Sequence, residues 1–294
     1  MSNVSSTSLT YSILASVLFG LTPWYVQWLS PLDGSVLFWN RILFSSITAF
    51  IALILMKQVT AFLAILKEPK IILLLGAGTG LVGFQWWLFV WTPVNGLTKE
   101  LSLGYFLLPL TLVLTGRVVY GEKPRPLQWL AIAFALTGIA HELILYGTLS
   151  WVPLLISGLY PFYFLIRRRV DANTLACFLF ENLLLLPIAI FALAMDTSFS
   201  EIITQRIEFI YLLPGLGALC TSAMLVYVAA SKALPVSLFG LLSYLEPAVL
   251  FMVAILILRE PVPPGQWLTY GFIGVATLII CVDSIRIIRQ PAAA

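Results

Sequence analysis

The sequence predicts an all-α integral membrane protein with ten transmembrane helices, arranged as two inverted five-helix repeats. Three observations predict this fold class: the composition, the spacing of apolar runs, and an internal repeat. Of 294 residues, 61% are hydrophobic and only 10% are charged, and the mean hydropathy is +1.01. A soluble domain carries about 25% charged residues, so a soluble fold is excluded and the lipid bilayer is the expected environment.

Polar residues, prolines and glycines divide the chain into apolar runs. A membrane core of about 30 Å needs about 20 apolar residues per helix. The predicted helices cover residues 9–29, 34–56, 70–91, 101–119, 127–146, 149–166, 173–195, 209–230, 237–258 and 265–285.

Lysine and arginine set the predicted orientation, because cytoplasmic loops are enriched in these residues. With the N-terminus inside, twelve of them fall in cytoplasmic segments: Lys57, Lys67, Lys70, Arg117, Lys123, Arg125, Arg167, Arg168, Arg169, Lys232, Arg286 and Arg289. Only Lys99, Arg206 and Arg259 fall in outer loops. Both termini are therefore expected in the cytoplasm, and the net charge of +3 is a topology signal that predicts no nucleic-acid partner.

Three features recur in one register, 138 residues apart. "GLTPWY" from Gly20 aligns with "GLYPFY" from Gly158, Pro109 aligns with Pro247, and Glu122 with a following "QWL" aligns with Glu260 and its own "QWL". The chain is therefore predicted to contain two copies of a five-helix unit, residues 1–147 and 148–294. Because five is odd, the second copy enters the membrane inverted, as in many secondary transporters.

Four prolines lie inside predicted helices at repeat-matched positions: Pro23, Pro161, Pro109 and Pro247. A proline removes a backbone N–H, frees a carbonyl and bends the helix. Paired interruptions are the pattern expected at a mid-membrane site between inverted repeats. These four helices are predicted to form the walls of a central cavity, although the prolines alone are also compatible with kinks that only shape the bundle.

Aromatic and polar side chains lie at the same depths as these prolines. Tyr105 and Tyr244 precede Pro109 and Pro247 by four and three residues, spacings that keep each pair on one helix face. The candidate binding residues are Trp24, Gln85, Trp86, Tyr105, Tyr163 and Tyr244. Each could instead pack in the core, but a tyrosine hydroxyl at mid-membrane needs a partner.

Arg41, Glu181 and Glu246 lie well inside predicted spans, where an unpaired charge costs at least about 2.5 to 3.5 kcal/mol. Counting about 1.5 Å per residue, Arg41 and Glu246 differ in depth by roughly 6 Å, so one ion pair with Arg41 is expected. The second glutamate must then be protonated, hydrated, or available to a cation.

The remaining polar and reactive groups carry weaker predictions. His141 and Glu142 are expected at the hydrated outer interface, and "RRR" (residues 167–169) at the inner headgroups. Cys177, Cys220 and Cys281 lie in apolar runs without a CxxC motif, which predicts core packing and no metal site. No cofactor and no catalytic residue is predicted.

These motifs resemble the EamA drug/metabolite transporter superfamily, and most closely its RarD branch. The resemblance covers nearly the whole chain and rests on "SLGYFLLPL" from Ser102, "YGEKPRPLQWLAI" from Tyr120, "ENLLLLP" from Glu181, and "YLEP" from Tyr244. It implies an inner-membrane carrier that moves small organic solutes, most often outward. Four residues match the pattern of the branch: Arg41, Tyr105, Pro109 and Glu181. Asn40, Leu108 and Glu246 depart from that pattern.

The sequence therefore predicts a secondary transporter that exports a small amphipathic metabolite or drug by alternating access. Glu246 or Glu181 is expected to bind either a proton, as coupling ion, or a cationic group of the substrate. An intramembrane enzyme or a lipid-handling protein is the alternative, but HExxH and nucleotide-binding motifs are absent from the sequence.

Overall fold

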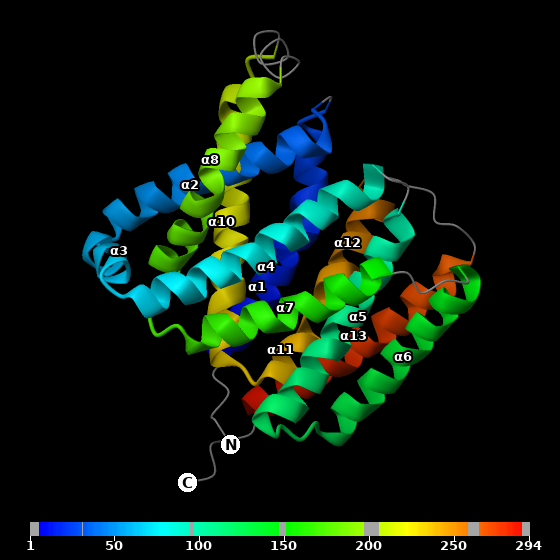
Figure 1. Cartoon of the computed structure of the whole chain (residues 1–294). Coiled ribbons are helices and arrows are strands. Elements are labelled where there is room, and N and C mark those ends of the chain that lie inside the picture. The colour runs from blue at the N-terminus through cyan, green and yellow to red at the C-terminus, as the bar shows by residue number, and fades with distance from the viewer. Residues whose placement is uncertain are drawn as a thin grey trace.

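The structure is a computed structural model that describes residues 6–30, 32–94, 97–146, 151–196, 206–257 and 265–289. Every regular element in these ranges is an α-helix (Figure 1). The helices are α1 (Ser6–Gln27), α2 (Gly34–Leu55), α3 (Val59–Leu66), α4 (Pro69–Val94), α5 (Thr98–Tyr120), α6 (Pro126–Tyr146), α7 (Trp151–Arg169), α8 (Thr174–Met195), α10 (Phe209–Ala233), α11 (Val236–Leu242), α12 (Leu245–Leu256) and α13 (Gln266–Arg289).

Eight of the described helices are long and apolar enough to cross a bilayer: α1, α2, α4, α5, α6, α8, α10 and α13. The other two predicted spans correspond to α7 and to α11 with α12. The three arginines at the end of α7 lower its hydropathy, and α11 and α12 are each too short to cross alone. A multi-pass membrane protein is thus supported, and the count of ten spans stays a prediction.

The predicted helix 237–258 is not continuous, because the chain breaks into α11 and α12 at Ser243 and Tyr244, close to the interruption expected at Pro247. Pro247 explains the position of the break. It cannot donate to the carbonyl of Ser243 four residues earlier, and that carbonyl accepts instead from the N–H of Glu246 at 3.2 Å. The next carbonyl, of Tyr244, accepts from Thr277 Oγ1 at 3.2 Å.

Helix α3 differs from the sequence prediction, in which residues 57–69 connect two spans. Its sequence, VTAFLAIL, is an apolar run too short to cross a membrane. Ile65 is buried, and α3 packs against α8 and α4. A short apolar run between charged residues therefore forms a helix that covers the ends of its neighbours.

The helices pack in pairs that join the two halves of the chain. The main pairs are α6 with α13, α1 with α10, α5 with α7, α2 with α8, α2 with α10, α5 with α11, α1 with α12, α4 with α7, and α4 with α8. Helices α5 and α11 approach especially closely: a Cβ on Gly240 would lie 2.6 Å from Leu112 Cβ and 2.9 Å from the Pro109 carbonyl oxygen. We call the end of the bundle where α1 begins and α13 ends the terminal face (Figure 1).

Candidate functional site

Five side chains from five helices form a central group: Arg41, Trp86, Tyr105, Tyr160 and Glu246. The Arg41 guanidinium lies over the Trp86 ring, 4.4 Å from its centroid. The rings of Tyr105 and Tyr160 are 6.4 Å apart, and both tyrosines lie within electrostatic range of Arg41 and of Glu246. The central group thus combines one cation, one carboxylate and three aromatic rings.

Glu246 has no cationic partner. Among the described residues no cation lies within 4 Å of its carboxylate, and its side chain accepts no hydrogen bond. It is partly exposed, as are Arg41 and Tyr105. Glu246 occupies the first turn of α12, where the positive end of the helix dipole favours a negative charge. The helix break therefore explains how a carboxylate is tolerated at this depth.

Glu181 is paired with Arg167, so the expected pairing of a glutamate with Arg41 is wrong for both glutamates. Nε of Arg167 lies 3.7 Å from Oε1 of Glu181, and the two side chains are 0% and 2% exposed. Tyr163 donates its hydroxyl to Oε2 of Glu181 at 3.3 Å. The expectation that all of "RRR" lies at the headgroups is also wrong, since Arg167 is fully buried.

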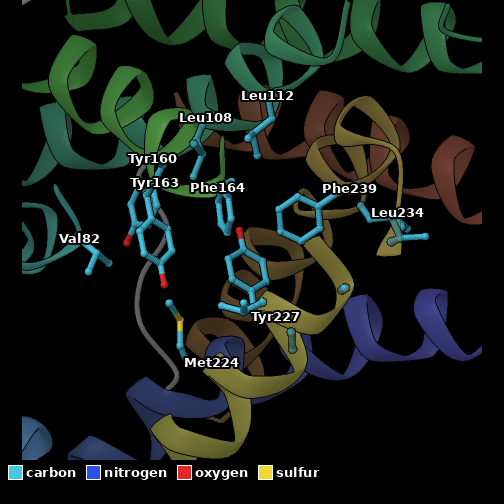
Figure 2. Packing of buried hydrophobic residues seen from close by; sticks show 14 of the residues in the cluster. Val82, Leu108, Leu112, Tyr160, Tyr163, Phe164, Met224, Tyr227, Leu234 and Phe239 are labelled. Atoms are coloured by element: carbon cyan, nitrogen blue, oxygen red, sulfur yellow. The ribbon is translucent and has the colours of Figure 1, made fainter. Parts of the chain in front are cut away.

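An aromatic cluster lies between the central group and the terminal face. It consists of Phe19, Phe164, Tyr227 and Phe239, and Figure 2 shows the last three facing one another. Their ring centroids are 4.8 to 5.6 Å apart. Phe164 follows Tyr160 by four residues along α7, toward the terminal face, or about 6 Å. Phe164, Tyr227 and Phe239 are buried and Phe19 is partly buried, so the cluster closes this side of the bundle around the central group.

The four repeat-matched prolines all lie inside helices: Pro23 in α1, Pro109 in α5, Pro161 in α7, and Pro247 in α12. Pro161 frees the carbonyl of Ser157, and Thr111 of α5 donates its hydroxyl to that carbonyl at 2.6 Å. Tyr244 donates its hydroxyl to the carbonyl of Phe106, close to Pro109, at 3.1 Å. A neighbouring helix therefore supplies the hydrogen bond that Pro161 leaves open, as membrane helices require.

The other predicted binding residues have varied surroundings. Gln85 donates to the carbonyls of Leu155 and Ile156 in α7, at 2.9 and 3.0 Å, and is buried. Tyr244 is fully buried, whereas Trp24 is exposed and contacts Trp28 edge-on. The structure thus gathers four of the predicted residues in the central group: Arg41, Trp86, Tyr105 and Glu246. The other four make the separate contacts described above: Gln85, Tyr163, Tyr244 and Trp24.

Glu122 connects the two halves of the chain at the terminal face. Gly121 ends α5 in the left-handed conformation, with φ +65°, and directs Glu122 back over the helix end. The Glu122 carboxylate accepts two hydrogen bonds from the first N–H groups of α11, those of Val236 and Ser237, each at 2.7 Å. The repeat-matched Glu260 lies outside the described residues.

His141 and Glu142 are less hydrated than expected, because Glu142 is buried against α13. Thr269 donates its hydroxyl to Oε2 of Glu142 at 2.7 Å, and Nδ1 of His141 lies 2.9 Å from the same hydroxyl oxygen. A threonine hydroxyl has one proton, so the Nδ1–H of His141 is the donor in this chain. The three residues tie α6 to α13.

Sequence reasoning missed Arg167, Tyr160, Tyr227 and Phe239. Arg167 belongs to a run of three arginines that predicts a headgroup position, but helical spacing places it on a different face from Arg168 and Arg169. Tyr160 directly precedes Pro161 and could have been found from that position. Tyr227 and Phe239 lie in ordinary apolar runs, and only their packing identifies them.

The described residues contain no group of three or more His, Cys, Asp or Glu side chains that could hold a metal ion. The central group instead offers one charge of each sign and aromatic faces, which suit non-covalent binding of a small charged or amphipathic molecule.

No protein-family model matches the chain. It is 40% identical over 293 residues to the chloramphenicol-sensitive protein RarD of Pseudomonas aeruginosa, covering 98% of each chain. It is 38% identical to an uncharacterized transporter of Pasteurella multocida, over 84% of this chain and 86% of that one, and 28% identical to the Protein RarD of Escherichia coli, over 95% of each. A solved crystal structure with 15% identity has the same fold, with a TM-score of 0.70 over 96% of this chain and 99% of that one.

Proposed function

This chain belongs to the RarD branch of the EamA drug/metabolite transporter superfamily, and we propose that it moves a small organic solute across the inner membrane by alternating access. Its relatives are named RarD proteins and transporters rather than enzymes, which together with eight apolar spans supports a membrane transporter. We propose export as the direction of transport and a cytoplasmic location for both termini, which makes the terminal face the cytoplasmic one.

The partly exposed, unpaired Glu246 is the observation that carries this proposal. Glu181 already has Arg167 and Tyr163 as partners, so of the two glutamates only Glu246 is free to bind a proton or a cationic group of the solute. The faces of Tyr105 and Tyr160 would add cation–π and apolar contacts to an amphipathic cation, while the Trp86 ring already lies against the Arg41 guanidinium. The proton is the proposed alternative occupant of the same carboxylate.

Two inverted repeats, residues 1–147 and 148–294, would supply the two conformations. The helix contacts support this proposal. Exchanging α1 with α7, α2 with α8, α4 with α10, α5 with α11–α12, and α6 with α13 converts each of the main pairs named above into itself or into another main pair. For example, α1 with α10 becomes α7 with α4, and α5 with α7 becomes α11–α12 with α1.

In this scheme the described structure represents the conformation that is closed at the terminal face. The aromatic cluster and the Glu122 contacts both lie on that side of the central group. Opening would separate Phe164 of α7 from Tyr227 and Phe239, while the matched helices of the other half close the opposite side.

A flux assay tests the proposal. Purified protein is screened by thermal shift with amphipathic cations and with chloramphenicol, after which the relative from Pseudomonas aeruginosa is named, and hits are followed in proteoliposomes at two pH values. We expect Glu246→Gln to abolish flux or its pH dependence, while Glu68→Gln, which removes an exposed carboxylate, leaves both unchanged. Wild-type flux with wild-type pH dependence in Glu246→Gln would refute the role of this carboxylate.

A further inference from the structure

A groove of about 540 Å³ lies at the terminal face, away from the central group. It is formed by the last residues of three helices and one loop: Val119 and Tyr120 of α5, Arg168 and Arg169 of α7, Val170 and Asp171 after α7, and Lys232 of α10. We propose that this groove binds the phosphate-containing headgroup of an anionic phospholipid.

The groove is positively charged, as a binding site for an anion requires. Three cations and one carboxylate line it, and none of these cations lies within 4 Å of a described carboxylate. The fourth charged group, Asp171, is exposed, and its carboxylate repels an anion. With all four groups ionised the groove carries a net charge of about +2. Helix ends of this kind lie at the level of the lipid headgroups, where such cations attract anionic lipid.

Two of the cations are held in place by neutral partners. Arg168 donates to the carbonyl of Leu234, and its guanidinium lies 5.2 Å from the centre of the Tyr120 ring. Lys232 donates to the carbonyl of Val170 at 2.9 Å. These bonds fix the side chains without cancelling their charge, so little side-chain entropy would be lost when an anion binds.

The neighbouring surface favours a lipid over a soluble phosphate. Leu114 and Val118 of α5, at (i, i+4), are 59% and 72% exposed, and Val118 directly precedes Val119, which lines the groove. In a membrane these side chains face lipid, so an acyl chain can lie along α5 while its headgroup occupies the groove. A free phosphate would gain nothing from this apolar surface.

Binding of phosphatidylglycerol to the purified full-length protein in detergent tests the proposal, with phosphatidylcholine of the same chain length and soluble glycerol phosphate as comparisons. Native mass spectrometry gives the affinities. We expect phosphatidylglycerol to bind in preference to phosphatidylcholine. Arg169→Gln should weaken its binding about fivefold, since one basic residue near anionic lipid is worth about that factor.

Two further variants separate local binding from general charge. Asp171→Asn should strengthen binding of phosphatidylglycerol, because it removes the opposing carboxylate. Lys70→Gln removes an exposed charge at the start of α4 and should change nothing. Equal binding of both lipids, an equal loss in Lys70→Gln and Arg169→Gln, or full competition by glycerol phosphate would overturn the proposal.

Discussion

The contact between Glu122 and the start of α11 can be tested by the change Glu122→Gln. The carboxylate accepts two N–H groups, from Val236 and Ser237, each at 2.7 Å. A hydrogen bond to a charged group is worth about 1.5 to 3 kcal/mol. Glutamine keeps one acceptor oxygen and places an NH₂ group against the second N–H, so at least one such bond is lost.

If these bonds exist only when the terminal face is closed, their loss shifts the conformational equilibrium toward the open form. A loss of about 1.5 to 3 kcal/mol corresponds to roughly a ten- to hundredfold shift. Electron–electron resonance distances between spin labels at Lys123→Cys and Ala233→Cys report the opening, in a protein whose three native cysteines are replaced by alanine.

We expect a second, longer distance in Glu122→Gln. Glu68→Gln is the matched control, because it removes one exposed carboxylate from the connection before α4. A folded Glu122→Gln protein whose distances equal those of the wild type and of Glu68→Gln would refute the reasoning.

Two further changes concern buried polar groups. Glu181→Gln leaves Arg167 charged and buried without its partner, so we expect a loss of about 3 to 5 kcal/mol in the free energy of unfolding. Glu246→Gln, which breaks no ion pair, should leave the unfolding temperature in detergent near that of the wild type, and equal losses in the two variants would contradict the assignment. Thr269→Val removes the donor to the buried Glu142 and should cost about 1 to 3 kcal/mol, measured by thermal unfolding; an unchanged midpoint would show that Glu142 finds another donor.

The membrane spans could be predicted from the sequence because burial in lipid requires long apolar runs, and most predicted bounds agree with the helices to within a few residues. The break in the ninth span could be predicted only in part. Pro247 marks the interruption, but its effect falls on the carbonyl of Ser243, four residues earlier, so α11 already ends at Leu242. This offset of four residues follows from the i to i−4 hydrogen-bond pattern of the helix. It is missed when the break is placed at the proline.

The charge pairs could not be predicted from depth alone. Arg41 and Glu246 have similar depths, yet Arg41 lies over Trp86 and Glu246 stays unpaired. Arg167 pairs with Glu181 because α7 and α8 both pack against α4, a contact that no local pattern contains. Depth restricts which residues can meet, whereas helix rotation and neighbours decide which do.

The close approach at Gly240 has a consequence for how the two halves can move. Helices α5 and α11 meet almost backbone to backbone there, with no side chain of Gly240 between them. No interlocked side chain at this point has to be lifted out of a groove when one helix slides along the other, so such a displacement has a low steric barrier. A single methyl group at residue 240 would overlap Leu112 and the Pro109 carbonyl, and it would act as a wedge that holds the two helices apart.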